Sequence, residues 1–108
     1  MPLRRWLDSR VEEAPAALKA RIGVLVDAHP EWEQLPVPEA LIAASDLLMA
    51  GVLASPEKDR RTALDLLAAD ACVTYAFEAA AETPARLVGL AETSMLHMAQ
   101  MIERAGTE

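Results

Sequence analysis

The chain has 108 residues, of which 53% are hydrophobic, and a formal net charge of −7. The hydrophobic share excludes a disordered acidic tail, and the length predicts one domain, 1–108. The negative balance argues against a protein that binds nucleic acid, because phosphate contacts need clustered Lys and Arg.

Two helical segments are predicted at the start of the chain. Residues 3–13 favour a short leading helix that carries Trp6. Residues 15–27 repeat apolar side chains at helical spacing and predict the first main helix. This helix ends before Pro30, because the residue that precedes a proline resists the helical conformation.

A proline-rich connector is predicted at 30–38, followed by the second main helix at 38–54. We expect Trp32 and Leu35 in the connector to fold back onto the core. As an alternative, Trp32 could anchor a binding partner, since tryptophan is enriched at interfaces.

Two longer helices are predicted in the second half of the chain. Ser55 favours an N-cap for a third helix at 56–82, in which a proline occupies the first position. Thr83 favours the same arrangement for a fourth helix at 84–105, and Gly106 is a candidate C-cap.

An all-α fold follows from the 22 alanines and the low aromatic content of 4%. Four main helices with short connections predict an antiparallel bundle, with a short extra helix at the N-terminus. The third helix is apolar on two sides, so three other helices leave part of it uncovered, which predicts a homodimer. Its two apolar sides comprise Leu66, Ala69, Val73, Phe77 and Ala80, and Leu64, Leu67, Ala71 and Tyr75. Outward-facing Val24, Leu47 and Leu96 support the same prediction.

A row of polar side chains follows the third helix at intervals of four residues: Asp70, Thr74, Glu78 and Glu82. If the row faces a cavity, its carboxylates could bind a divalent metal or act as an acid–base pair. The alternative is a solvated stripe, or carboxylates paired with arginines. The sequence argues strongly against a carboxylate–histidine di-metal site, because the di-iron pattern requires a Glu-x-x-His motif, which this sequence lacks.

The fourth helix adds three candidate binding residues. His97 could donate a hydrogen bond to a carboxylate of the third helix or bind a metal, or it could be a partly exposed residue at the edge of the core. Met98 and Met101 share one predicted face with Met95, and they could form an adaptable binding groove or fill the core. Together with Tyr75 and the polar row, these residues form the predicted binding set.

Cofactors and extracellular chemistry are not indicated. The single cysteine, Cys72, lies in an apolar helical pattern and is expected to be a buried, unreactive thiol. The N-terminal residues lack the apolar region of a signal peptide, and no uninterrupted apolar run reaches the length of a membrane span. We therefore expect a cytoplasmic protein with no cofactor, no metal and no membrane span.

The stretch at 66–78, LLAADACVTYAFE, resembles one helix of the trans-isoprenyl diphosphate synthases. In that family an apolar run, Gly-Asp and a later Phe-Glu commonly follow the first aspartate-rich motif. Here Ala69 replaces the glycine, and no Asp-Asp-x-x-Asp motif occurs in the chain. The resemblance covers about 13 residues and implies isoprenoid binding or an accessory role rather than synthesis.

Three functions remain open on these grounds. The first is an interaction or accessory module acting as a homodimer, which the two-sided third helix and the absence of catalytic motifs favour. The second is a bundle that binds a small molecule or lipid. The third is a metal site or enzyme built on the polar row.

Overall fold

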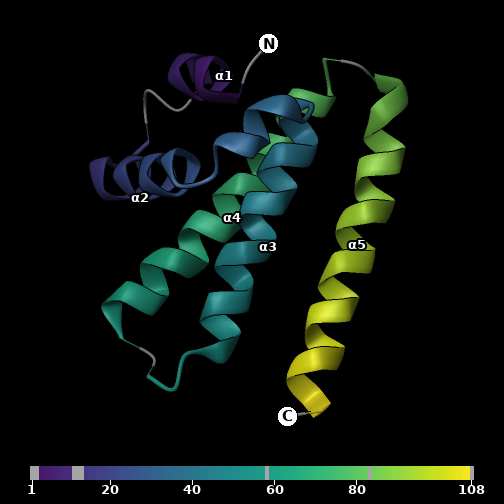
Figure 1. Ribbon diagram of the computed structural model, residues 1–108. Coiled ribbons are helices and arrows are strands. Elements are labelled where there is room, and N and C mark those ends of the chain that lie inside the picture. Colours follow the sequence, from purple (N-terminus) through teal and green to yellow (C-terminus); the bar gives the residue numbers. More distant parts are fainter. Residues whose placement is uncertain (1–2, 11–13, 58, 83, 108) are drawn as a thin grey trace.

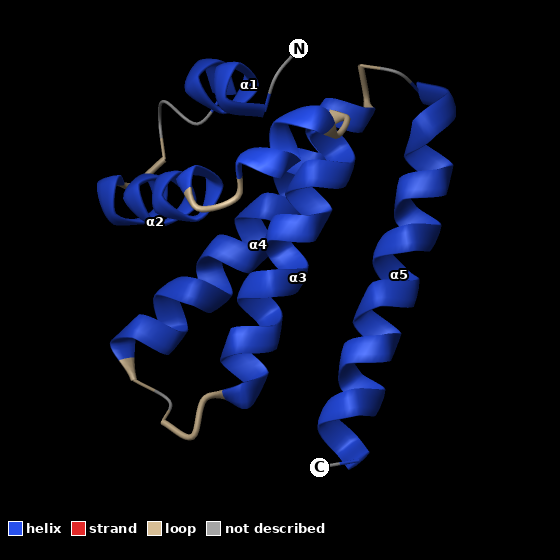
Figure 2. Ribbon diagram, viewed as in Figure 1, coloured by secondary structure: helices blue, strands red, loops and turns tan. Residues whose placement is uncertain are grey.

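The computed structural model describes residues 3–10, 14–57, 59–82 and 84–107, with side chains omitted at 84–87, 90 and 107. All regular elements in this part are helices (Figures 1 and 2). In chain order they are α1 (Leu3–Arg10), α2 (Ala16–Asp27), the 3₁₀ helix η1 (Pro30–Gln34), α3 (Val37–Ala54), α4 (Arg60–Ala80) and α5 (Pro84–Thr107). The predicted all-α class is confirmed.

The centre of the molecule is the antiparallel pair α3 and α4 (Figure 1). The buried side chains of α4 are all small: Ala68, Ala69, Cys72, Ala76, Ala79 and Ala80. Small side chains allow two helix backbones to approach closely, so little space is left between them. The hydroxyl of Ser45 in α3 crosses this interface and donates a hydrogen bond of 3.0 Å to the carbonyl oxygen of Ala69. The predicted burial of Cys72 is confirmed.

The N-terminal elements α1, α2 and η1 pack together near the end of the α3–α4 pair where α3 begins and α4 ends (Figure 1). Trp6 and Trp32 are buried there, at 2% and 6% exposure. On the flank of this layer, Arg21 of α2 donates a hydrogen bond of 2.6 Å to Asp65 of α4. The expectation that Trp32 joins the core is confirmed. Leu35 stays 39% exposed, so the same expectation for Leu35 is wrong.

Two predicted helix boundaries differ from the structure. Helix α4 begins at Arg60 rather than Pro56, because the Asp59 carboxylate accepts the backbone N–H of Thr62 (3.0 Å) and caps the helix. The hydroxyl of Ser55, predicted to be the cap, instead donates to the Glu57 carbonyl oxygen at 2.7 Å. At the other end of the chain, α5 continues through Gly106.

Two further predictions concern the proline-rich connector and the N-cap of the last helix. The connector contains a short 3₁₀ helix that the sequence did not predict. The predicted N-cap Thr83 lies outside the described residues.

Helix α3 is long and apolar enough, by length and composition, to cross a membrane, with a mean hydropathy of 1.6. Its apolar residues are interrupted by Glu39 and Asp46, which is why no continuous apolar run was found in the sequence. In the structure 44% of the helix is buried against its neighbours. Central helices of globular domains share these properties, so the composition of α3 has a sufficient explanation in its packing.

Helix α5 runs beside the α3–α4 pair along its whole length (Figure 2). Among its described side chains only Met101 is buried. Five of its large apolar side chains are exposed: Val88, Met95, Leu96, Met98 and Ile102. The last helix therefore covers its neighbours incompletely and carries an apolar surface of its own.

Candidate functional site

The polar row predicted on the third helix lies on the exposed side of α4. Asp70, Thr74 and Glu78 are exposed, and the Thr74 hydroxyl donates to the backbone carbonyl of Asp70 at 3.2 Å. Glu82 accepts hydrogen bonds from Arg10 (2.7 Å) and from the Trp6 indole N–H (3.3 Å). Glu82, two residues after the end of α4, therefore connects this end of the helix to α1. The other three residues of the row are exposed to solvent. Within the described residues, no group of three or more His, Cys, Asp or Glu side chains is arranged to hold a metal ion.

Tyr75, on the second apolar side of α4, packs against the N-terminal layer. Its ring meets that of Trp6 edge to face, with centroids 6.1 Å apart. Burial raises the pKa of Tyr75 above its ordinary value, and the charge of Glu78 raises it further. Tyr75 therefore belongs to the packing between α1 and α4 and does not meet His97 or the methionines of α5.

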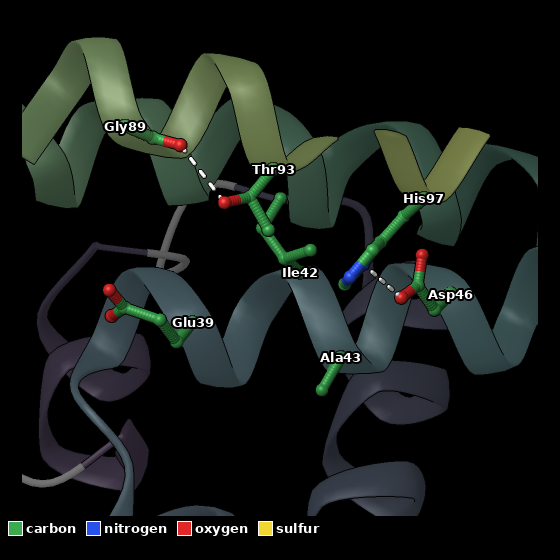
Figure 3. A pocket seen from close by; sticks show the side chains of 7 residues that line it. All are labelled: Glu39, Ile42, Ala43, Asp46, Gly89, Thr93 and His97. Carbon is green, nitrogen blue, oxygen red and sulfur yellow. Dashed lines mark hydrogen bonds and ion pairs between the residues drawn. The ribbon is translucent and has the colours of Figure 1, made fainter. Parts of the chain in front are cut away.

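His97 reaches α3 rather than α4. Its Nδ1 atom lies 2.6 Å from the Asp46 carboxylate oxygen Oδ2, an ion-pairing distance without the angles of a well-formed hydrogen bond. The two residues lie in a cleft of about 400 Å³ between α3 and α5 (Figure 3). Its other lining residues are Glu39, Ile42, Ala43, Gly89 and Thr93. The Thr93 hydroxyl donates to the Gly89 carbonyl oxygen at 3.0 Å and is thereby satisfied within its own helix.

Burial dominates the electrostatics of Asp46. Desolvation raises the pKa of this carboxyl group above 3.8, against the opposing effects of His97 and Arg104. Sequence reasoning missed Asp46 as the partner of His97. The available signal was a lone acid within the apolar stretch 40–54, since such a carboxylate is rarely left without a partner.

The methionines of α5 do not share one face in the structure. Met101 is buried (6% exposed), Met95 points outward (72%), and Met98 lies between them (46%). Met98 and Met101 border a small cavity of about 50 Å³ with Val73 of α4 and Met49 of α3. Met101 is therefore core filler, whereas Met95 and Met98 belong to the surface.

An apolar stripe runs along one flank of α5, partly turned to solvent. We call it the outer stripe; its members are Val88, Ala91, Met95, Met98, Ile102 and Ala105. They follow one another at alternating intervals of three and four residues, the spacing of a coiled-coil seam. Val88, Met95 and Ile102 are 68%, 72% and 64% exposed, whereas Met98 and Ala105 also border cavities beside α3.

Comparison with models of protein families, with curated proteins and with solved structures finds no match to this chain.

Proposed function

We propose that this chain is a helical protein-interaction or accessory module without a catalytic centre, which acts as a cytoplasmic homodimer and docks through the outer stripe of α5. The proposal includes the antiparallel four-helix bundle predicted for the domain, with α2 to α5 as its helices. One observation carries the docking surface: the outer stripe has the spacing of a helix-pairing seam, yet its large side chains stay exposed.

The size of the surface is compatible with a weak protein interface. The four large residues of the outer stripe, Val88, Met95, Met98 and Ile102, present roughly 450 Å² to solvent. The largest apolar patch of a typical monomer is about 300–600 Å², and a standard interface buries about 800 Å² per partner. A dimer formed through this surface should therefore be weak and dissociate on dilution.

The distribution of charge also supports docking at the stripe. None of its six residues is charged, so pairing buries no unpaired charge. The net charge of −7 makes two copies repel one another at long range. Because salt screens this repulsion, the dimer should become tighter as ionic strength rises.

Sedimentation tests the proposal directly. The wild-type chain should show a monomer–dimer equilibrium, and Met95→Glu should shift it strongly toward monomer, because the substitution places a charge in the middle of the stripe. The matched control is Gln100→Glu, which adds the same charge at an exposed position on the other side of α5. A wild-type chain that stays monomeric at the highest concentration, or a Met95→Glu variant that dimerises like the wild type, would refute the proposal.

A second candidate function is supported by the cleft between α3 and α5. Its volume of about 400 Å³ lies within the range of small-molecule sites, and it combines an apolar floor at Ile42 with the Asp46–His97 pair. A small molecule that carries an amino group suits the two carboxylates of this lining, Glu39 and Asp46. Native mass spectrometry of the purified chain distinguishes this function, because a bound ligand adds a fixed mass that unfolding removes.

A further inference from the structure

We infer that the small cavity where α3, α4 and α5 meet is a Cu(I) site, with the thioethers of Met49, Met98 and Met101 as its ligands. The three side chains come from two helices and border one cavity of about 50 Å³. The inference goes beyond the proposed function, because it requires no second copy of the chain. It follows from the size of the cavity, the donor atoms around it and one buried hydroxyl group.

The methionines approach the cavity from both sides of the α3–α5 interface. Met98 and Met101 are three residues apart on α5, so their side chains are neighbours on that helix, and Met49 belongs to α3. Methionine has three rotatable bonds, so small rotations can bring the sulfur atoms toward a common centre. Met101 is 6% exposed and Met98 is 46% exposed. The site therefore lies at the edge of the core, where an ion can enter from the side of Met98.

The volume of the cavity suits an ion and excludes an organic ligand. Binding sites for small organic molecules have volumes of about 300–1,000 Å³. A single water molecule requires about 10–15 Å³ of such a cavity. A cavity of about 50 Å³ therefore accommodates one metal ion together with a water molecule, and it is far too small for a cofactor or a substrate.

The donor atoms of the lining select a soft ion. Thioethers favour Cu(I), whereas Ca²⁺ and Mg²⁺ need about six to eight oxygen ligands. The side-chain oxygens at the cavity belong only to Ser45, Asp46 and Ser94, and the Ser45 hydroxyl already donates to the Ala69 carbonyl oxygen. Zn²⁺ takes thiolate, imidazole and carboxylate ligands. No group of three or more such residues is arranged for a metal in the part of the chain that the structure describes.

The charge around the cavity favours a monovalent cation. Asp46 is the charged residue of the lining, and its carboxylate offsets the single charge of Cu(I). His97 and Arg104 of α5 act on the same carboxylate, and the thioethers are neutral. A divalent ion therefore brings more positive charge to this site than Asp46 balances.

A buried hydroxyl group indicates that the cavity takes a polar occupant. The Ser94 oxygen is buried, borders the cavity and has no hydrogen-bond partner among the described residues. Buried polar groups in proteins are nearly always hydrogen-bonded, either to the protein or to ordered water. A water molecule carried by the ion supplies that partner.

An ion held by these ligands joins α5 to α3. The interface between the two helices otherwise contains clefts of about 400 and 220 Å³. The three ligands separate when α5 detaches, so the ion binds the docked state of the helix and stabilises it by mass action. Attachment of the last helix to the core thus becomes dependent on Cu(I).

Anaerobic titration with Cu(I), in competition with the coloured chelator bicinchoninate, tests the site. The wild-type chain should bind one equivalent. Met49→Leu, Met98→Leu and Met101→Leu should each weaken the binding at least about tenfold. Leucine replaces methionine at small cost in packing but lacks the sulfur, and circular dichroism checks that each variant is folded.

Two control variants accompany the titration. Met95 is 72% exposed and does not border the cavity, so Met95→Leu should bind Cu(I) like the wild type. Cys72 requires its own control, because a thiolate is also a soft ligand. Cys72 does not border the cavity, and burial raises the pKa of its thiol to about 12, so Cys72→Ala should retain the binding.

Amide hydrogen exchange provides a second measurement, which does not depend on the chelator. Exchange along α5 should slow when Cu(I) is added to the wild-type chain and should stay unchanged in Met101→Leu. The inference is overturned if the wild type binds no Cu(I), or if the three ligand variants bind like Met95→Leu. Loss of binding in Cys72→Ala also overturns it, because the cysteine is then the ligand. Sedimentation without Cu(I) tests the homodimer separately, so the two proposals stand or fall independently.

Discussion

Helices α4 and α5 both lie against α3, but they are held in different ways. The α3–α4 interface is lined by alanines and Cys72, and its described side chains are almost fully buried. Between α3 and α5 there are instead clefts of about 400 and 220 Å³, and only Met101 of the described α5 side chains is buried. The small side chains of α4 allow close packing against α3. The larger, flexible side chains of α5 leave the α3–α5 interface loosely packed.

The two interfaces are expected to contribute differently to the stability of the fold. Free energy of folding is concentrated where apolar side chains lose contact with water, which here means α3, α4 and the N-terminal layer. A helix with few buried contacts opens at low cost and is suited to docking.

The largest expected effect is the difference between two single leucine-to-alanine variants, one in α3 and one in α5. Leu41→Ala in α3 removes a side chain that is 0% exposed, and we expect a loss of about 2–5 kcal/mol in the free energy of unfolding. Leu96→Ala in α5 removes one that is 57% exposed, and we expect a change within about 0.5 kcal/mol. Urea denaturation of both variants measures the difference. Equal losses would mean that α5 contributes to the core as α3 does.

An intermediate effect is expected from adding volume. Ala76 is fully buried in α4, so Ala76→Leu should force α3 and α4 apart and cost about 1–3 kcal/mol. Ala99 is exposed on α5, and Ala99→Leu uses the same substitution with a nearly neutral expected result. Thermal unfolding compares the two variants. A tolerated Ala76→Leu would show that the α3–α4 interface contains unfilled space.

The smallest effect concerns the cleft between α3 and α5. Because burial raises the pKa of Asp46 above 3.8, the folded chain holds this proton more tightly than the unfolded chain. Stability contributed by this group is therefore complete below pH 3.8 and is lost as the pH rises through the higher folded value. Asp46→Asn should be slightly more stable than the wild type at pH 7, and the difference should shrink in acid.

Urea denaturation at several pH values measures this difference. The groups that act on Asp46 are His97 and Arg104 of α5, and Glu39 of α3 lines the same cleft. If Asp46→Asn is less stable at pH 7, attraction to His97 and Arg104 outweighs the cost of burial.

Much of the fold could be predicted from the sequence because prolines mark the helix starts and apolar spacing marks the helix faces. The start of α4 was predicted wrongly because two nearby residues can both act as its N-cap. Ser55 and Asp59 are both good caps, and the contact between Asp59 and Thr62 decides which of them begins α4. Trp32 was correctly placed in the core, whereas Leu35, three residues later, stays exposed.

The candidate site was less predictable, because partners distant in the sequence meet only in the folded chain. The pairing of His97 with Asp46 depends on how α5 lies on α3, and periodicity within one helix does not encode that placement. The spacing of the outer stripe is visible in the sequence. Its exposure is not, because it depends on the area of α5 that α3 and α4 leave uncovered.

The positions of the two tryptophans have a consequence for spectroscopy. Trp6 lies in α1 and Trp32 in η1, both buried in the N-terminal layer, and the sequence of α5 contains no tryptophan, tyrosine or phenylalanine. Intrinsic fluorescence therefore reports the N-terminal layer, whereas far-ultraviolet circular dichroism also registers α5, which has 24 residues. Detachment of α5 alone would be silent in tryptophan emission, so the two signals recorded on one sample distinguish fraying of the last helix from global unfolding.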